Sequence, residues 1–260
     1  MKTVVISVYL TLFLFATSWA LKPDDPAIVG VWLFEEGGGN VVKDSSGHKN
    51  DGKINGNFKW EDGKFGKAIV AAGGGSIDVQ DSPSILSVKD ALTVAAWFRV
   101  DANSDTGVRK NSAYLLEDQS SSEPVPDGFS FRIWTTNGIT PGFYGKTKLK
   151  QKQWYHVAGT FDGKTVEMYI DGEPESVKGA LDAGGAAWKP EWGGKITPGE
   201  MLQLKFGPEP YTGGIDEIVI LSRALSADEI KQLLNGWDKA FAVQPQDKLA
   251  VRWGQIKSLK

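Results

Sequence analysis

Three groups of acidic residues that could carry out chemistry in this chain are adjacent pairs: Glu35-Glu36, Glu117-Asp118 and Asp216-Glu217. Two carboxylates can hydrolyse a glycosidic bond only if they face the same cleft, roughly 5–10 Å apart. Neighbouring side chains on a strand point to opposite faces, so no pair meets this requirement by itself. Carboxylates from different strands could still converge. A glycoside hydrolase therefore stays as the less favoured alternative.

The other reactive side chains restrict the chemistry further. The chain has no cysteine, which excludes thiol catalysis, redox function and cysteine-type zinc sites. It has two histidines, His48 and His156, and neither lies in a context typical of a Ser-His-Asp triad. His156 falls inside a strand-like run, so we expect a packed scaffold residue. The net charge of −3 and the pI near 5.5 are unlike those of a nucleic-acid-binding protein. We predict no catalytic residue and no nucleic-acid partner.

Two tryptophans are the candidates for ligand binding. Trp188 and Trp192 lie in the segment 179–199, which is rich in Gly, Ala and Pro. An exposed loop tryptophan can serve as a platform for a sugar ring, because it offers apolar area with a polar N–H at its edge. An indole in a long loop can instead close the end of a sandwich as a small core. Both interpretations stay open, and Trp188 and Trp192 are the predicted ligand-binding residues.

The N-terminus resembles a secretory signal. A positive charge at Lys2 precedes an apolar stretch from Val4 to Ala16, and the small residues Ser18 and Ala20 follow. This order is typical of a signal peptide, here residues 1–20 with cleavage after Ala20. The apolar stretch is shorter than the roughly 20 residues of a spanning helix, and no later stretch is long and uncharged. We expect a secreted, extracytoplasmic protein that is not transmembrane.

Short runs rich in β-branched and aromatic residues alternate with Gly, Asn, Asp and Ser clusters along the rest of the chain. This alternation is typical of an all-β sandwich or barrel. The clearest predicted strands are 28–34, 92–100, 129–134, 154–161, 166–170 and 214–221. In the last of them we expect Glu217 to share a face with Ile215 and Asp216 to face the other way. Ser226 and Glu229 form a capping box, which predicts one short helix ending at Asn235-Gly236.

Three blocks of sequence resemble one known family. They are Gly30-Val-Trp-Leu-Phe-Glu-Glu-Gly with Lys43-Asp-Ser-Ser-Gly-His and Gly63-Lys-Phe-Gly-Lys-Ala, then Leu92-Thr-Val-Ala-Ala-Trp-Phe with Trp154-Tyr-His-Val-Ala-Gly-Thr-Phe-Asp-Gly-Lys, and finally Gly214-Ile-Asp-Glu-Ile with Arg223-Ala-Leu-Ser-Ala-Asp-Glu-Ile. Together they resemble the laminin-G-like jelly-roll domain of the concanavalin A-like lectin/glucanase superfamily. The resemblance implies a two-sheet antiparallel β-sandwich over residues 27–236.

The same resemblance implies calcium, because calcium is the family's commonest accessory. Asp44, Ser46 and Asn50 lie in one polar loop, and Asp216 starts a C-terminal strand that runs beside the N-terminal strand in this family. A loop plus a carboxylate from another strand could supply oxygens to a hard cation. We therefore predict a structural calcium site at Asp44, Ser46, Asn50 and Asp216. In the alternative interpretation, Asp44 forms an Asx-type turn and Asp216 caps loop amides.

The sequence favours a non-catalytic binding module for carbohydrate or glycoconjugate, with a carbohydrate or glycoprotein as its ligand. A protein-interaction or adhesion module on the same scaffold is the alternative, and its partner would be a cell-envelope or extracellular protein. The C-terminal tail, residues 237–260, is too apolar for a free disordered end. We expect it to pack on the domain or to dock a partner.

Overall fold

The computed structural model describes residues 21–101, 107–118, 128–139, 143–145, 147–175, 193–206 and 213–240. The predicted signal peptide, residues 1–20, and residues 241–260 of the tail lie outside the described part. The elements are β1 (Ile28–Trp32), β2 (Val41–Val42), β3 (Gly52–Asp62), β4 (Lys67–Val79), η1 (Ile85–Ser87), β5 (Leu92–Val100), β6 (Gly107–Lys110), β7 (Tyr114–Asp118), β8 (Phe129–Thr135), β9 (Gly138–Ile139), β10 (Phe143–Tyr144), β11 (Gln153–Phe161), β12 (Val166–Ile170), β13 (Glu173–Pro174), β14 (Leu202–Phe206), β15 (Gly213–Leu221), α1 (Ala227–Leu233) and α2 (Trp237–Ala240).

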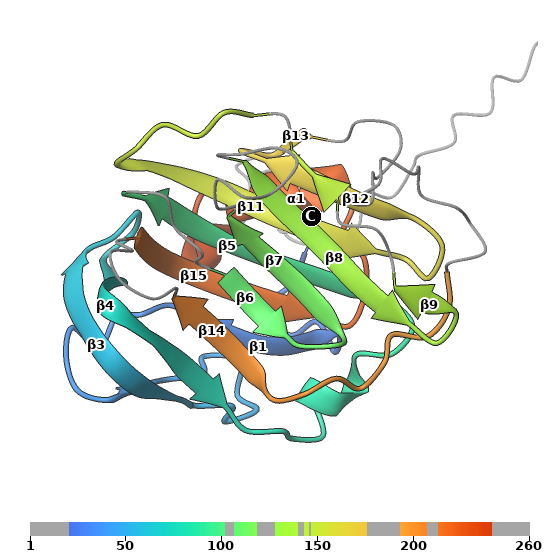
Figure 1. Ribbon diagram of the computed structural model, residues 1–260, viewed down its shortest axis with the longest axis horizontal. Helices are drawn as coiled ribbons and strands as arrows, with labels where there is room; N and C mark the ends of the chain where they lie inside the picture. Colours follow the sequence, from blue (N-terminus) through green and yellow to red (C-terminus); the bar gives the residue numbers. More distant parts are fainter. Residues whose placement is uncertain are drawn as a thin grey trace, which may run out of the picture.

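The strands pair antiparallel in one sheet that curls back on itself, in the order β10-β8-β7-β6-β14-β4-β15-β5-β11-β12-β13. The long strand β4 joins the two layers, because its first half pairs with β15 and its second half with β14. Between the halves, Gly74 and Gly75 have positive φ values of 79° and 153°, which few other residues tolerate. The front layer (β8, β7, β6 and β14) crosses in front of β5, β11 and β15 in Figure 1. The predicted all-β jelly-roll fold is confirmed.

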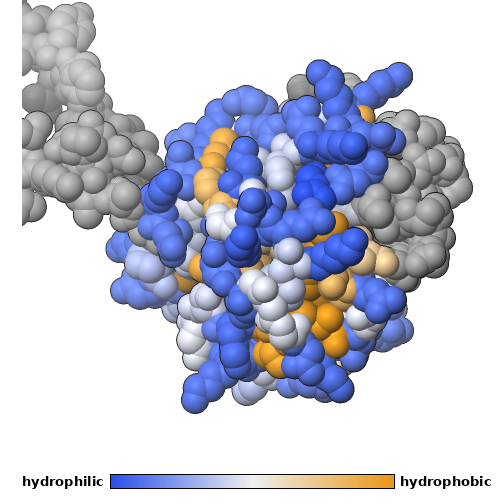
Figure 2. All heavy atoms as spheres, turned by 90° about the vertical axis from the view of Figure 1, so that its left-hand side faces the viewer, coloured by the Kyte–Doolittle hydropathy of each residue, from blue (hydrophilic) through white to orange (hydrophobic). Residues whose placement is uncertain are grey.

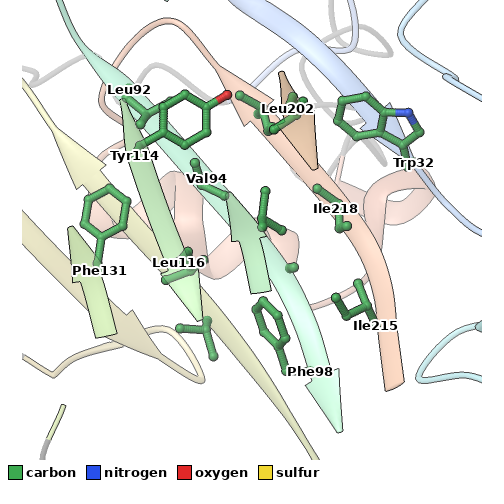
Figure 3. Packing of buried hydrophobic residues seen from close by; sticks show 14 of the residues in the cluster. Trp32, Leu92, Val94, Phe98, Tyr114, Leu116, Phe131, Leu202, Ile215 and Ile218 are labelled. Carbon is green, nitrogen blue, oxygen red and sulfur yellow. The ribbon is translucent and has the colours of Figure 1, made fainter. Parts of the chain in front are cut away.

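The core fills the space between the two layers. Phe98 of β5 and Ile215 of β15 come from the back layer, while Leu116 of β7 and Phe131 of β8 come from the front layer; all four are at most 1% exposed. Figure 3 shows these side chains directed toward one another between the strands. Burial of such side chains contributes roughly 1.5–3 kcal/mol each, and this supplies the main driving force for closing the sandwich.

A second, smaller core lies on the outer face of the back layer. Helix α1 packs Ile230 and Leu233 there against Val31 of β1 and Leu221 of β15. The helix begins as predicted, because Ser226 and Glu229 form the capping box. The chain then forms a second short helix, α2, where the sequence predicted only one. Trp237 at the start of α2 belongs to the same cluster and is 8% exposed, so the beginning of the predicted tail packs on the sandwich.

Strand β15 departs from the predicted alternation. Its pairing with β5 shifts between Asp216 and Val219, which marks a β-bulge, and Glu217 has a φ of 47°. Ile215 and Ile218 therefore both face the main core, while Val219 faces the second cluster. The expectation that Glu217 shares a face with Ile215 is wrong, because Glu217 accepts a hydrogen bond from the Trp237 N–H at the second cluster. A bulge inserts an extra residue and reverses the alternation after it.

The side of the molecule formed by β3 and β4 is mostly hydrophilic, with a strip of hydrophobic residues between the polar ones (Figure 2). Partly buried Ile54, Phe58 and Trp60 of β3 pack against the main core. No helix in the described ranges is long and apolar enough to cross a membrane.

Candidate functional site

The outer face of the front layer carries a set of polar side chains that we call the polar face: Asn55, Ser76, Asp78, Gln203, Arg109, Glu117, Arg132 and Trp134. The register of the strands brings them together. Asp78 of β4 pairs with Gln203 of β14, and Gln203 pairs with Arg109 of β6. The core-facing residues of β8 are Phe129, Phe131 and Ile133, so Arg132 and Trp134 point outward.

Asp78 is the centre of a hydrogen-bond network on this face. Its Oδ1 accepts from Ser76 Oγ at 2.7 Å and from Gln203 Nε2 at 2.9 Å, and its Oδ2 accepts from Asn55 Nδ2 at 2.9 Å. These bonds fix the two amide groups in place. Within the described residues, no group donates to the amide oxygens of Asn55 and Gln203, so both can accept from a ligand hydroxyl.

The other half of the polar face is cationic and aromatic. Arg109 forms an ion pair with Glu117 of β7. The guanidinium carbon of Arg132 lies 5.8 Å from the ring centroid of Trp134, and the indole is half-buried. Trp134 on β8 and Gln203 on β14 share this face but are three strand spacings apart, roughly 14 Å. A planar ring and fixed amides at this separation can contact different units of one polyhydroxylated ligand.

The carboxylates of the polar face do not fit a glycosidase. Asp78 and Glu117 share this face, but β14 and β6 lie between their strands. Three strand spacings separate them by about 14 Å, whereas the two acids of a glycosidase lie roughly 5–10 Å apart. The arrangement is suited to binding.

The sequence signal for this face is weak. Trp134 ends a predicted strand, but Gln203 lies in β14, which the sequence pattern did not reveal. The predicted ligand-binding residues Trp188 and Trp192 lie outside the described residues, so their positions relative to the polar face are not described.

The predicted metal loop is closed by its own hydrogen bonds. Asp44 Oδ1 accepts from the backbone N–H groups of Val31 at 3.0 Å and Ser46 at 2.9 Å. Its Oδ2 accepts from Ser46 Oγ at 2.8 Å and from the Asn50 N–H at 2.9 Å. The buried Asn50 amide donates to Val29 O and Ser84 Oγ. The loop thus forms an Asx-type turn that anchors 44–50 to β1.

Asp216, the fourth predicted ligand, belongs to a different set of contacts. Its Oδ2 accepts from the Phe65 N–H at 2.9 Å, so it caps the turn at residues 63–66. Among the described residues, no hydrogen bond or ion pair joins Asp216 to the Asp44 loop, and no group of three His, Asp or Glu residues is arranged to hold a metal ion. Calcium needs six to eight oxygen ligands. This donor set fits two capped loops rather than a calcium cage.

Asp216 also ends a row of buried polar side chains. It pairs with Trp97 of β5, which pairs with His156 of β11. The turn at 63–66 covers this row, with Lys64 Nζ 4.1 Å from the Trp97 ring centroid. Burial, with a smaller contribution from Lys64, lowers the pKa of His156 to about 3, so the imidazole is neutral. His156 is 2% exposed, which confirms that it is a scaffold residue.

Asp44→Ala is expected to destabilise the protein by about 2–3 kcal/mol, because it leaves partly buried donors at Val31, Ser46 and Asn50 without an acceptor. Urea unfolding measures this loss. The control is Asp62→Ala, which removes an exposed pair with Lys67 and should leave the urea midpoint unchanged.

A chelator provides a second test of the loop. If the loop depends on its own hydrogen bonds, a chelator does not change the melting temperature of the native protein. If calcium instead raises the melting temperature of the native protein but not that of Asp44→Ala, the calcium prediction is supported.

Several solved structures share this fold at low sequence identity. The binding domain of Paraclostridial Mosquitocidal Protein 1 is 18% identical with a TM-score of 0.65, covering 82% of this chain and 53% of that one. Domain 4 of AbnA, a GH43 extracellular arabinanase from Geobacillus stearothermophilus solved with arabinotriose, is 21% identical with a TM-score of 0.58, covering 80% and 98%. A botulinum neurotoxin type C structure, whose cell entry depends on two ganglioside molecules, is 14% identical with a TM-score of 0.58, covering 80% and 51%.

The chain therefore spans about half of the two toxin structures and nearly all of the arabinanase domain. At these identities the likeness concerns the fold alone. No curated protein matches the sequence. The sequence model of the concanavalin A-like lectin/glucanases superfamily matches residues 71–231. These residues include most of the front layer, the buried row of Trp97, His156 and Asp216, and the start of α1. The chain belongs to the concanavalin A-like lectin/glucanases superfamily.

Proposed function

We propose that the protein is a non-catalytic binding module for carbohydrate or glycoconjugate. The polar face carries this proposal, because Asp78 holds the amides of Asn55 and Gln203 in one network on the same outer face as the half-buried Trp134. Sugar hydroxyls both donate and accept, so fixed amides and a carboxylate match them, while an indole covers the apolar face of a pyranose or furanose ring.

The comparisons support the class of ligand. The arabinanase domain was solved with arabinotriose, and the neurotoxin structure concerns gangliosides. A further neurotoxin binding domain, 16% identical with a TM-score of 0.60 over 82% of this chain and 52% of that one, was solved with rat synaptotagmin II. Among structures with this fold, one thus holds a glycan, one concerns gangliosides and one holds a protein. Carbohydrate is the first choice for this chain because the network of Asn55, Asp78 and Gln203 offers fixed hydrogen-bonding groups to sugar hydroxyls.

Export belongs to the proposal as well. The signal-like N-terminus would place the module outside the cytoplasm, where glycans are accessible. Trp188 and Trp192 stay proposed ligand-binding residues. Calcium stays a prediction of the family resemblance, and no step of binding on the polar face requires it.

Gln203→Ala and Asn55→Ala are each expected to weaken glycan binding about tenfold, since each removes a hydrogen bond worth roughly 1–1.5 kcal/mol. Trp134→Ala should weaken it at least as much. A glycan array identifies the ligand, and calorimetry on the best oligosaccharide gives the dissociation constants. The matched control is Gln151→Ala, which truncates an exposed glutamine outside the polar face.

The proposal fails if the native protein binds no glycan at high concentration, or if Gln151→Ala weakens binding as much as Gln203→Ala. Capture of an extracellular protein without any glycan would favour the protein-interaction alternative. Melting temperatures of all variants separate loss of binding from loss of folding. Trp188→Ala and Trp192→Ala form a second pair: weaker sugar binding at unchanged stability supports a binding role, whereas a large loss of stability supports packing.

A further inference from the structure

Strand β3 is an open edge of the sheet over its last residues. β2 pairs with β3 only at Gly52 and Lys53, and a bulge between Gly56 and Phe58 interrupts the pairing of β3 with β4. Over residues 59–62, no strand in the described part of the chain pairs with the outer side of β3. Figure 1 shows β3 at the left-hand edge of the molecule. An open edge of this kind is a template for pairing with another strand.

The main chain of this edge offers free hydrogen-bonding groups. The Gly63 N–H donates to Gly66 O at 3.0 Å, in the turn that follows Asp62. Hydrogen-bonded and non-hydrogen-bonded pairs alternate along an antiparallel ladder, so Glu61 bonds to β4, whereas Trp60 and Asp62 direct their N–H and C=O groups outward. Among the described residues, no hydrogen bond uses these outward groups. A second strand can therefore bond to both residues.

The side chains of the edge differ between its two faces. Trp60 is half-buried and packs against the main core, so Lys59 and Glu61 lie on the opposite face. Lys59 is exposed and forms no ion pair within the described ranges. The Glu61 side chain is 41% exposed and lies 3.1 Å from the Arg99 guanidinium. The edge thus presents a ring on one face and, two positions apart on the other face, one cation and one anion.

We propose that this edge pairs antiparallel with the same edge of a second copy of the chain, about a two-fold axis at Trp60. Such symmetry brings one patch against itself. With Trp60 opposite Trp60, the outward main-chain groups of the two copies bond to each other, and Lys59 stands opposite Glu61 of the second copy. The Lys59–Glu61 contact forms twice, at non-hydrogen-bonded positions where the Cα atoms are about 4.5 Å apart and the side chains are closest.

The charges select this register. If the axis moved by one residue to Glu61, Glu61 would stand opposite Glu61 of the second copy. If it moved by one residue to Lys59, two lysines would be opposed. Like charges directly opposite each other destabilise a strand pair, whereas opposite charges stabilise it. The pattern Lys59-Trp60-Glu61 therefore opposes the neighbouring symmetric registers and permits the one centred on Trp60.

The turn after β3 does not extend the edge toward the second copy. Lys64 Nζ lies 4.1 Å from the Trp97 ring centroid, and the Phe65 N–H donates to Asp216, so the turn folds over the outer face of the back layer. The paired segment is short, which makes this a weak interface of the small class. It joins two polar faces in one particle and can raise the affinity for a ligand with repeated units. The pairing itself does not depend on the proposed function.

Sedimentation equilibrium of the mature protein tests the pairing. The native protein should form a dimer and nothing larger, with a dissociation constant of about 10–100 µM. Lys59→Glu and Glu61→Lys each oppose like charges, so each should weaken the dimer at least about tenfold. Both substitutions in one chain restore opposite charges and should restore the dimer. The matched control is Lys53→Glu, an exposed lysine on the part of β3 that pairs with β2, which should leave the dimer unchanged.

Cysteine cross-linking tests the register without relying on charge, because the chain has no cysteine of its own. Lys59→Cys mixed with Glu61→Cys should form an intermolecular disulfide on mild oxidation faster than either variant alone, since only the mixture brings two thiols directly opposite each other. Equal rates in the three samples would overturn the register. A protein that stays monomeric at about 1 mM, or a dimer that Lys59→Glu leaves intact, would overturn the proposal. Melting temperatures show whether each variant is folded.

Discussion

Replacing Gly159 by alanine is expected to destabilise the protein by about 3 kcal/mol. Gly159 lies in the middle of β11 and faces the core, where a Cβ would stand 2.4 Å from the ring of Phe131 on the opposite layer. Phe131 is fully buried, and β11 is held between β5 and β12. Neither the strand nor the ring can move without opening other contacts, so the strain stays local and large. Urea unfolding monitored by tryptophan fluorescence measures it.

Gly38→Ala is the matched control, since no atom lies within 4 Å of the Cβ that it adds. Its free energy of unfolding should stay within about 0.5 kcal/mol of the native value. The double variant Gly159→Ala with Phe131→Leu should recover part of the loss if the clash causes it, because the smaller side chain yields space. A Gly159→Ala protein that unfolds at the native midpoint would show that the two layers are packed less tightly than the structure has them.

Local signals in the sequence were sufficient for several elements. The strand predicted over 92–100 is β5, and that over 166–170 is β12. Both are dense in β-branched and aromatic residues and end at turn residues, so their bounds depend on neighbours along the chain. The capping box at Ser226 fixed the start of α1 for the same reason. Trp32 lies on the predicted strand 28–34, and it is fully buried.

Features that depend on pairing between distant segments were not accessible in this way. The bulge at Asp216 arises because β15 must pair with β5 on one side and with β4 and β1 on the other. Trp97 and Trp154 lie on predicted strands, but the strand pattern did not show that both are on the outer face of the back layer. Trp97 is buried there under Lys64, while Trp154 is half-buried with the Arg99 guanidinium 5.6 Å from its ring centroid.

The polar face illustrates the same limit for function. Asn55, Asp78 and Gln203 come from β3, β4 and β14, and up to 148 positions separate them along the sequence, the difference between 55 and 203. Each residue alone is an ordinary polar strand residue facing outward. Only the register places their side chains in one network, and register between non-local strands depends on the whole sheet. Sequence patterns therefore indicate only tryptophans in loops, where a local signal exists.

Asp216→Asn is expected to change how stability depends on pH. Burial raises the pKa of Asp216 from 3.8 to about 7, and the neighbouring Glu217 charge adds to this shift. The folded protein thus favours the protonated acid, so this stabilisation is fully present below pH 4 and is lost as pH rises through 7. A shift of about three units corresponds to about 4 kcal/mol. Asn resembles the protonated acid in shape and lacks the charge. The variant should equal the native protein at pH 4 and be more stable by up to about 4 kcal/mol at pH 8.

The difference between the two proteins isolates this effect, because other carboxylates act in the opposite direction. Arg223 and Ser226 lower the pKa of Glu229 despite its burial, which makes that residue stabilising above its unfolded pKa. Subtracting the variant's curve of unfolding free energy against pH from the native curve removes such contributions, provided that they are the same in both proteins. Asp24→Asn, at an exposed position, controls for the loss of one charge and should follow the native curve. If Asp216→Asn is less stable than the native protein at pH 8, the ionised carboxylate stabilises the fold through its bond to Phe65, and burial is not the dominant effect at this position.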